Sequence, residues 1–225
     1  MKYGVIIAAR TGSSRLPGKV LLPLKGIPMV VFLIKRLRFS RLADQIVFAT
    51  TMLAEDDMLV DVVASEGIPV FRGANEDVVK RFVNTADEFE IEYVVRVTGD
   101  CPFVDGETLD YCLKKCEEFD SFDLASTKKA FPVGIDYEIY AAEVMKKLHQ
   151  SDKLNAEGRE HLTKYIYDHT SMFDVRRIYP PEKWNCHKSA FTVDTTEDYR
   201  FAQQVLEQFD TVNFSVEELI KSIRA

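Results

Sequence analysis

Short apolar runs and longer amphipathic stretches alternate through the first 120 residues, and this alternation limits the fold more than any other feature of the sequence. We expect strands at 3–8, 45–49, 69–71 and 93–97, and helices at 29–38, 56–65, 76–89 and 106–118. Strands that alternate with helices indicate a mostly parallel sheet. The strands are almost entirely apolar, as in Val5-Ile6-Ile7, which is typical of a sheet with helices on both faces. The sequence therefore predicts a three-layer α/β/α fold.

The alternation weakens after about residue 120. In this half we expect strands at 122–126, 136–140, 173–178 and 189–193, and helices at 142–149 and 158–169. Two capping boxes, Thr195-x-x-Asp198 and Ser215-x-x-Glu218, predict the starts of two further helices. Because no low-complexity linker divides the chain, we expect a single domain over residues 1–225. Residues from 1 to about 120 would form the nucleotide-binding half. Residues from about 121 to about 190 would form an elaboration of the same domain that binds the sugar and the second subunit.

The expected helix at 76–89 has one apolar face. That face carries Val78, Val79, Phe82, Val83, Ala86 and Phe89. The charged residues are expected largely on the opposite face, and they are Lys80, Arg81, Asp87 and Glu88.

Charge and hydropathy exclude two classes of partner. The chain carries a formal net charge of -7, whereas a protein that binds nucleic acid needs a basic face to neutralise phosphates. No apolar run approaches the roughly 18 residues of a membrane span, and the first nine residues lack the cleavage-type flank of a signal peptide. We therefore expect a cytoplasmic protein that binds neither nucleic acid nor membrane.

The four cysteines do not indicate a zinc site. The sequence has no close CxxC pair, and Cys112 and Cys116 are one helical turn apart in an expected helix. We expect buried free thiols at these positions and at Cys101 and Cys186.

The stretch IIAARTGSSRLPGK, residues 6–19, joins the first expected strand to a loop suited to an anion. Small residues let backbone N–H groups approach a ligand, hydroxyls donate hydrogen bonds, and cations supply charge. The small residues are Ala8, Ala9 and Gly12, the hydroxyls belong to Ser13 and Ser14, and the cations are Arg10, Arg15 and Lys19. The alternative is a solvated basic turn. Because ligands of open α/β sheets lie at the carboxyl ends of the strands, we predict a phosphate-binding loop.

Two common phosphate loops do not match this stretch. Five residues separate Gly12 from Gly18 instead of four, and Val20 stands where a Walker A loop has its magnesium-binding Ser or Thr. The dinucleotide pattern G-x-G-x-x-G does not follow the first expected strand. The loop therefore belongs to a different class of anion site.

Three aspartates lie where expected strands end or expected helices begin. Asp100 ends RVTGD, Asp194 ends FTVD, and Asp105 lies near the start of the helix at 106–118. Two carboxylates beside a phosphate loop can hold one Mg²⁺, which takes few protein oxygens and leaves room for phosphates and water. The alternative for each aspartate is a helix N-cap. We predict Asp100 and Asp194 as metal ligands and Asp105 as a cap.

Six blocks occur in order along nearly the whole chain: AARTGSSRLPGK, FRGANEDVVKRF, RVTGDCPFVD, FPVGIDYEIY, REHLTKYIY and FTVDTTEDYR. Together they resemble the cytidylyltransferases that make CMP-activated acidic sugars, the CMP-sialate and CMP-keto-deoxyoctulosonate synthetases. Within that family the sequence is most similar to the spore coat polysaccharide biosynthesis protein F group. Thr196 departs from the pattern, because the family usually has Pro there. The resemblance implies a Rossmann-like nucleotidyltransferase sheet.

The resemblance also implies roles for individual residues. Nucleotide-binding roles fall on Ala8, Ala9, Arg10, Gly12, Ser13, Arg15, Lys19, Arg72 and Asp77, and catalytic roles on Lys19, Arg15 and Asp100. The metal ligands would be Asp100 and Asp194. The sugar side would comprise Gly134, Asp136, Glu138, Glu160 and His161. From the residues alone, Asp136 and Glu138 could equally lie on a solvated strand face, and His161 could be a structural histidine at helix spacing with Tyr165.

The implied reaction transfers CMP from CTP to a 2-keto-3-deoxy or related acidic sugar and releases pyrophosphate. Its cofactor would be Mg²⁺, its context surface or spore coat polysaccharide biosynthesis, and its oligomeric state a homodimer. Two alternatives stay open. A glycosyltransferase that uses a nucleotide sugar would want a close Asp-x-Asp pair, which the neighbours of Asp100 do not offer. A non-catalytic nucleotide-binding module would bind CTP without turnover.

Overall fold

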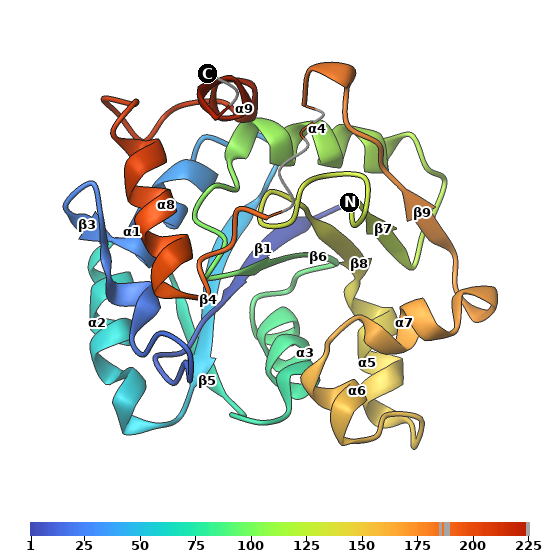
Figure 1. The fold of residues 1–225 in the computed structure, drawn as a ribbon. Coiled ribbons are helices and arrows are strands. Elements are labelled where there is room, and N and C mark those ends of the chain that lie inside the picture. Colours follow the sequence, from blue (N-terminus) through green and yellow to red (C-terminus); the bar gives the residue numbers. More distant parts are fainter. Residues whose placement is uncertain (185, 187–189, 224–225) are drawn as a thin grey trace.

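The computed structural model describes residues 1–184, 186 and 190–223, which form a seven-stranded sheet between layers of helices (Figure 1). The strand order is β5-β4-β1-β6-β8-β7-β9. The four strands of the first half are parallel, and they are β1 (Tyr3–Ala8), β4 (Gln45–Thr51), β5 (Val70–Gly73) and β6 (Tyr93–Thr98). The predicted mostly parallel α/β/α fold is confirmed.

The second half of the chain extends the same sheet. β8 (Glu138–Ala141) lies antiparallel between β6 and β7 (Leu124–Ser126), and β9 (Val175–Arg177) runs parallel to β7. Because β8 is antiparallel to β6, its first residues lie at the carboxyl end of β6, and Glu138 is paired with Arg96. A separate ribbon pairs β2 (Pro23–Leu24) with β3 (Ile27–Pro28).

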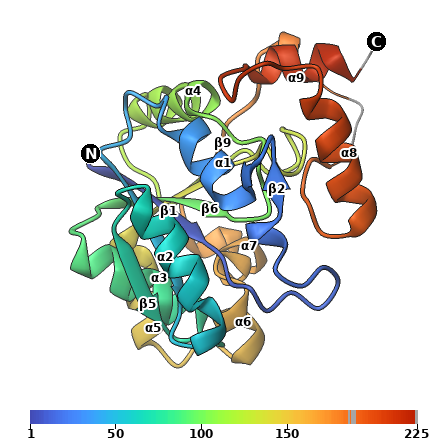
Figure 2. The ribbon, with the colours of Figure 1, turned by 90° about the vertical axis from the view of Figure 1, so that its left-hand side faces the viewer.

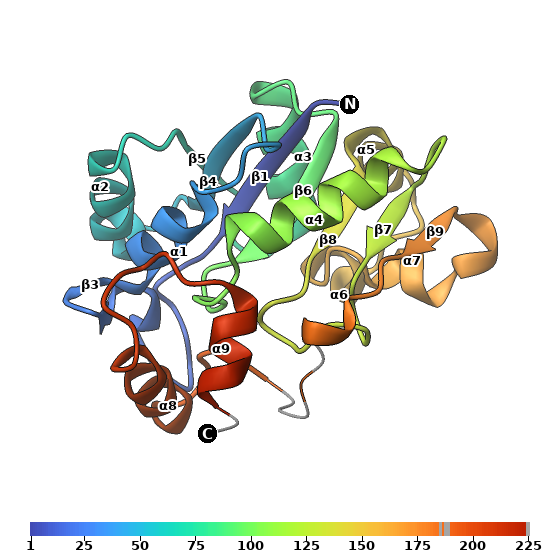
Figure 3. The ribbon, with the colours of Figure 1, turned by 90° about the horizontal axis from the view of Figure 1, so that it is seen from above.

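Helices cover both faces of the sheet (Figures 2 and 3). One core forms under α1 (Met29–Leu37), α2 (Asp57–Ser65), α4 (Gly106–Glu117), α8 (Thr196–Leu206) and α9 (Val216–Ser222). The other forms under α3 (Val78–Glu88), α5 (Ala142–Gln150), α6 (Ala156–Glu160) and α7 (Lys164–Asp168). In β1, Val5 and Ile7 join the first core and Ile6 joins the second, so the strand is apolar throughout.

Four short 3-10 helices complete the secondary structure of the described residues: η1 (Lys19–Leu21), η2 (Ala54–Asp56), η3 (Thr170–Met172) and η4 (Glu182–Trp184). Over residues 1–184, 186 and 190–223, no helix combines the length and apolar character needed to cross a membrane. Both predicted capping boxes are present, at the N-termini of α8 and α9.

The prediction of a single helix over residues 158–169 is wrong. The structure has α6 and α7 instead, separated at His161, whose φ of -99° and ψ of 83° lie outside the helical region. The break places Thr163, which is buried, so that its hydroxyl donates to the Glu138 carboxylate at 2.7 Å. A tertiary hydrogen bond therefore accompanies the interruption of the helix.

The strand expected at 189–193 does not form over its described part. Ala190 makes an isolated bridge with Val133, and residues 191–193 belong to no strand. Ser189, like His187, lies outside the described residues. The backbone is held instead by two loop contacts, because Phe191 N donates to Val133 O at 2.7 Å and Val193 N donates to Asp100 O at 2.8 Å.

Two further predictions, both about which side chains are buried, are wrong. Arg81 was expected on the polar face of its helix, but it is 5% exposed and contributes to the interior beside the sheet. Among the cysteines, Cys112 and Cys116 are buried as expected, whereas Cys101 and Cys186 are only half-buried.

Candidate active site

The loop after β1 is anchored at its base by Asp56. Thr11 donates from its backbone N at 2.7 Å and from its hydroxyl at 2.8 Å to Asp56 Oδ1, and the Thr50 and Thr51 hydroxyls donate to Oδ2. Burial alone would raise the pKa of Asp56, but these hydrogen bonds outweigh it and hold the pKa below its usual value. Gly18, with φ at 65°, closes the loop through a bond from its N to Thr11 O at 3.0 Å.

The loop delivers Lys19 to a position between two carboxylates. Its ammonium donates to Asp100 Oδ2 at 3.0 Å and to Asp194 Oδ1 at 2.8 Å. Lys19 is 8% exposed, and burial would lower its pKa, yet the charge of Asp100 and the bonds to both carboxylates raise it above its usual value. Arg15, which is more exposed, adds a second ion pair to Asp194 at 3.0 Å. Lys19 and Arg15 are therefore neutralised by Asp100 and Asp194.

The same contacts show how the two aspartates meet. Asp100 follows the carboxyl end of β6, and Val193 N donates to Asp100 O, which places Asp194 beside it. Asp194 N in turn donates to Asp198 Oδ2 at 3.1 Å within the first turn of α8. Lys19 lowers the pKa of Asp100, overcoming the effect of burial. The Asp100 carboxylate is therefore ionised near neutral pH, and Asp100 and Asp194 converge on one cation, the Lys19 ammonium.

A donor set of two converging carboxylates is compatible with Mg²⁺, which takes one or two protein carboxylates and completes its shell with phosphates and water. Within the part of the chain that the structure describes, no cluster of three or more His, Cys, Asp or Glu side chains could hold a metal. Asp100 and Asp194 are the residues that could hold this ion, because both carboxylates lie beside the loop after β1.

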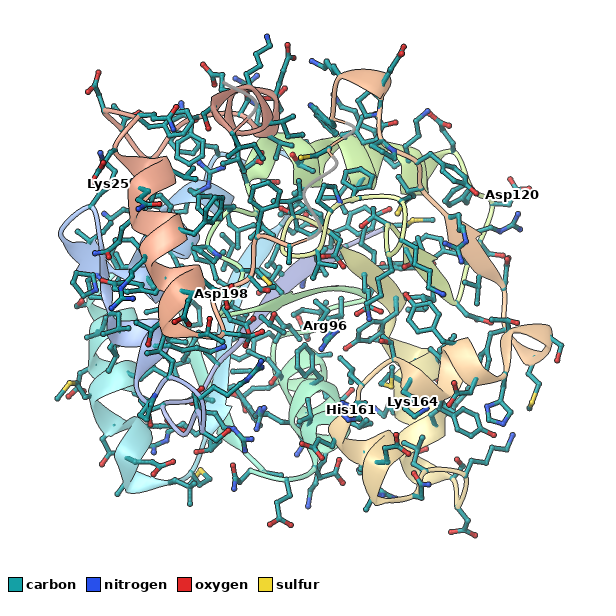
Figure 4. All side chains as sticks on the ribbon, in the orientation of Figure 1. Lys25, Arg96, Asp120, His161, Lys164 and Asp198 are labelled. Carbon is teal, nitrogen blue, oxygen red and sulfur yellow. The ribbon has the colours of Figure 1, made fainter. Side chains whose placement is uncertain are left out.

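A cavity of about 490 Å³ contains this charged group. The residues that line it and were predicted for the site are Ala8, Ala9, Arg10, Gly12, Ser13, Arg15, Lys19, Asp100, Glu160, His161 and Asp194. His161 is exposed at the break between α6 and α7, so the expected helical spacing with Tyr165 is wrong. Figure 4 labels two residues that line this cavity, Arg96 on β6 and His161 at the end of α6. The predicted residues converge although they come from distant elements.

Two predicted nucleotide-binding residues do not line this cavity. The Arg72 guanidinium donates to Thr51 O at 2.9 Å and Leu53 O at 2.8 Å, and it pairs with Asp57 at 2.7 Å. Asp77 caps α3 by accepting from Lys80 N and pairs with Arg159 at 3.0 Å. The structure therefore places both residues in contacts that hold loops and helices together.

A second cavity of about 280 Å³ adjoins the first, and Arg96, Thr98 and Asp100 line both. It contains Gly134, Asp136 and Glu138, the remaining residues predicted for the sugar side. Gly134 has φ at 87°, and a Cβ there would lie 2.7 Å from the backbone of Phe191, so only glycine fits. Asp136 Oδ1 accepts from Gly134 N at 2.8 Å, and burial raises its pKa.

Glu138 is buried and its carboxylate is surrounded by donors. It is paired with Arg96 and, at 2.9 Å, with Lys128, and it accepts from Thr163. Burial would raise its pKa, but the two cations and the hydroxyl outweigh burial and lower it. The alternative of a solvated strand face is wrong for Glu138, which is 3% exposed. Glu138 therefore orients Arg96 and Lys128 at the second cavity.

The pairing of Glu138 predicts how its contribution to stability depends on pH. Because its folded pKa lies below the usual 4.5, the contribution is complete above that value and is lost as pH falls through the folded pKa. We expect Glu138→Gln to be less stable than the wild type at about pH 6, and the difference to narrow towards about pH 3. Urea unfolding of both proteins at each pH measures this difference in the free energy of unfolding. A difference that does not change with pH would show that Glu138 is not held ionised.

Three cations that line these cavities were not predicted, namely Arg81, Arg96 and Lys128. Arg96 interrupts an otherwise apolar strand in VVRVT, which is a signal that sequence reasoning could have used. Arg81 and Lys128 carry no comparable local signal.

A larger cavity, of about 650 Å³, lies elsewhere, between α4, η4 and the start of α9. Of the predicted residues it contains Asp105 alone, which caps α4 by accepting from Thr108 N at 2.8 Å, as expected. We assign the site to the 490 Å³ cavity because the convergent charges lie there and because it opens at the carboxyl ends of parallel strands.

Comparisons with known proteins show the family of this chain. The family model described as cytidylyltransferase matches residues 4–221. The spore coat polysaccharide biosynthesis protein SpsF of Bacillus subtilis is 35% identical over 86% of this chain and 82% of its own length. A cytidylyltransferase from Leptospira borgpetersenii is 32% identical, with a TM-score of 0.93 over 100% of this chain and 94% of that one.

A more distant structure shares the fold. The CTP complex of CMP:2-keto-3-deoxy-manno-octonic acid synthetase has a TM-score of 0.72 and 19% identity, over 92% of this chain and 99% of that one. The three-layer α/β/α arrangement of this chain is the nucleotidyltransferase fold that these cytidylyltransferase structures share. This chain belongs to the cytidylyltransferase family.

Proposed function

We propose that this protein transfers CMP from CTP to a 2-keto-3-deoxy or related acidic sugar, with Mg²⁺ as cofactor and pyrophosphate as second product. The observation that carries the proposal is Lys19, whose ammonium joins Asp100 and Asp194 in the cavity after β1. Membership of the cytidylyltransferase family supports the reaction class. The CTP complex of the octonic acid synthetase supports the choice of nucleotide.

The reaction is an in-line attack of a sugar oxygen on the α-phosphate of CTP. An oxygen–phosphorus bond forms as the sugar hydroxyl loses its proton to water, and the bond between the α-phosphorus and the oxygen bridging it to the β-phosphate breaks, so that pyrophosphate leaves with the electron pair. Little covalent chemistry is needed, because positioning and charge stabilisation lower the barrier. Lys19 and Arg15 neutralise charge that develops on the pyrophosphate, and Ser13 and the backbone around Gly12 donate to its oxygens.

Asp100 and Asp194 are the residues that would hold Mg²⁺, which supplies charge neutralisation at the phosphates when bound. The second cavity takes the sugar, between Asp136 and the cations that Glu138 orients. The relation to SpsF supports a role in surface or spore coat polysaccharide biosynthesis. We propose a cytoplasmic homodimer as the working form, on the same resemblance.

Pyrophosphate release tests the proposal. We expect release with CTP and one acidic sugar when the four common nucleoside triphosphates are tested against keto-deoxy sugar acids and sugar phosphates. Removal of Mg²⁺ with EDTA should abolish release, and added Mg²⁺ should restore it. Free nucleotide released from a nucleotide sugar would instead indicate a glycosyltransferase. CTP binding without turnover on any sugar would indicate a binding module.

A further inference from the structure

Arg81 is a buried cation without a carboxylate partner among the described residues. It lies in α3 and is 5% exposed. Its Nη1 donates to the backbone oxygens of Ala74 at 2.6 Å and Asn75 at 3.5 Å. Its Nε is buried and has no hydrogen-bond partner, and no ion pair of the described residues includes it. One edge of the guanidinium, Nε with the adjacent Nη2, is therefore unused.

This arrangement is costly unless something outside the chain completes it. A buried donor without an acceptor, and a buried charge without a partner, each oppose folding. Burial lowers the pKa of Arg81 and the positive charge of Arg10 lowers it further, and the more distant charge of Asp56, which forms no ion pair with Arg81, offsets these effects only in part. The Arg10 side chain is held in place by Asn75, whose Oδ1 accepts from Arg10 Nη1 at 2.9 Å. An acceptor that enters the cavity would relieve both costs.

The surroundings of Arg81 show which kind of acceptor fits. Val78 and Phe82 line the cavity from the same helix, and their apolar side chains suit the faces of a planar ring. The phosphate-binding groups Ser13, Arg15 and Lys19 come from the loop after β1 and not from α3. Arg72 is held by Asp57 and by backbone oxygens outside the cavity. The α3 side of the cavity is thus suited to a nucleobase, with Arg81 as its donor.

We propose that Arg81 reads the pyrimidine base and selects cytosine over uracil. Cytosine presents two adjacent acceptors, O2 and N3, which match two parallel N–H groups on one edge of a guanidinium. Uracil has an N–H at N3, which faces that edge with a second donor. A bidentate arginine contact discriminates between bases by about ten- to a hundredfold. The inference rests on the proposed use of CTP, and it assigns nucleotide selection to a side chain of α3.

Calorimetry without sugar tests this inference apart from turnover. The ligands are CTP, UTP and 3-deaza-CTP, in which a C–H replaces N3. We expect the wild type to bind CTP about ten- to a hundredfold more tightly than either analogue. Arg81→Met should bind all three with nearly equal, weak affinity. Lys80→Met, an exposed cation one residue away on the same helix, should retain the wild-type preference.

Other outcomes overturn the inference. If Arg81→Met weakens the binding of CTP and of UTP equally and leaves the ratio of their affinities unchanged, Arg81 binds a phosphate or the ribose. If it lowers the melting temperature without altering any affinity, Arg81 is structural. Arg81→Gln provides a second variant, and circular dichroism of both checks their fold. A wild type that prefers CTP through Arg81 but releases no pyrophosphate would contradict the proposed reaction and leave base selection intact.

Discussion

Lys19→Ala is expected to lower kcat for pyrophosphate release by about 10²–10³-fold, the effect of removing one preorganised group that stabilises developing charge. In the structure the Lys19 ammonium already lies in the cavity beside Asp100 and Asp194, so it needs little reorganisation when charge develops on the leaving pyrophosphate. Alanine removes this cation from beside the phosphate oxygens. We expect KM for CTP to change less than kcat, because the effect is largest in the transition state.

Steady-state pyrophosphate release with saturating Mg²⁺ measures this effect. Lys147→Ala is the matched control, because Lys147 is exposed on α5 and pairs with Glu143 on the same helix. Asp100→Asn should reduce kcat by a similar factor while circular dichroism stays that of the wild type. Near-normal turnover in Lys19→Ala, with its fold retained, would falsify the assignment of the site.

Arg36→Leu is expected to destabilise the fold by about 3–5 kcal/mol, the cost of removing one partner of a buried ion pair. Arg36 is 1% exposed and pairs with Asp105 at 3.7 Å. It donates to the oxygens of Phe103, Val104 and Val212, and its guanidinium lies 3.8 Å from the ring centre of Phe214. Burial lowers the pKa of Arg36 to about 10, so it stays charged at neutral pH. Leucine would leave these acceptors buried and unpaired.

Urea unfolding measured by circular dichroism gives the free energy of unfolding of each variant. Arg38→Leu is the control, because Arg38 lies two residues away but its side chain is 40% exposed and pairs with Glu66. We expect that control to cost at most about 1 kcal/mol. Asp105→Asn combined with Arg36→Leu should recover part of the loss, because the buried carboxylate is then neutral. A loss in Arg36→Leu no larger than in Arg38→Leu would contradict the central role of this pair.

Elements with a strong local pattern were predictable. β1, β4 and β6 follow the apolar runs because each of these strands lies between two cores and buries both of its faces. β5, at the edge of the sheet, is only half-buried. The capping boxes of α8 and α9 were predictable because Ser or Thr and an acid three residues on bond to nearby backbone. The helix expected at 158–169 failed because its interruption follows a contact between Thr163 and Glu138, which are distant in the chain.

The candidate site also has a part that local sequence predicts and a part that it does not. The loop after β1 could be recognised because its small residues, hydroxyls and cations are neighbours in sequence. Arg81 was assigned to the wrong face because an arginine beside an apolar helix face can extend into solvent or into a cavity. The nucleotide-binding role of Arg72 stays a prediction, and in the structure this side chain pairs with Asp57 and does not line the cavity. Charge and helical periodicity do not show where a long side chain ends.

The sequence by itself determined the alternating α/β architecture and an anion-binding loop at the end of the first strand, since both depend on residues close together in the chain. Only the tertiary structure decided that Lys19 would lie between Asp100 and Asp194, which are 81 and 175 residues away. It also decided that Arg81 lines the cavity and Arg72 does not. The physical reason is that parallel strands bring distant segments to one sheet edge, where the contact of Val193 with Asp100 joins them.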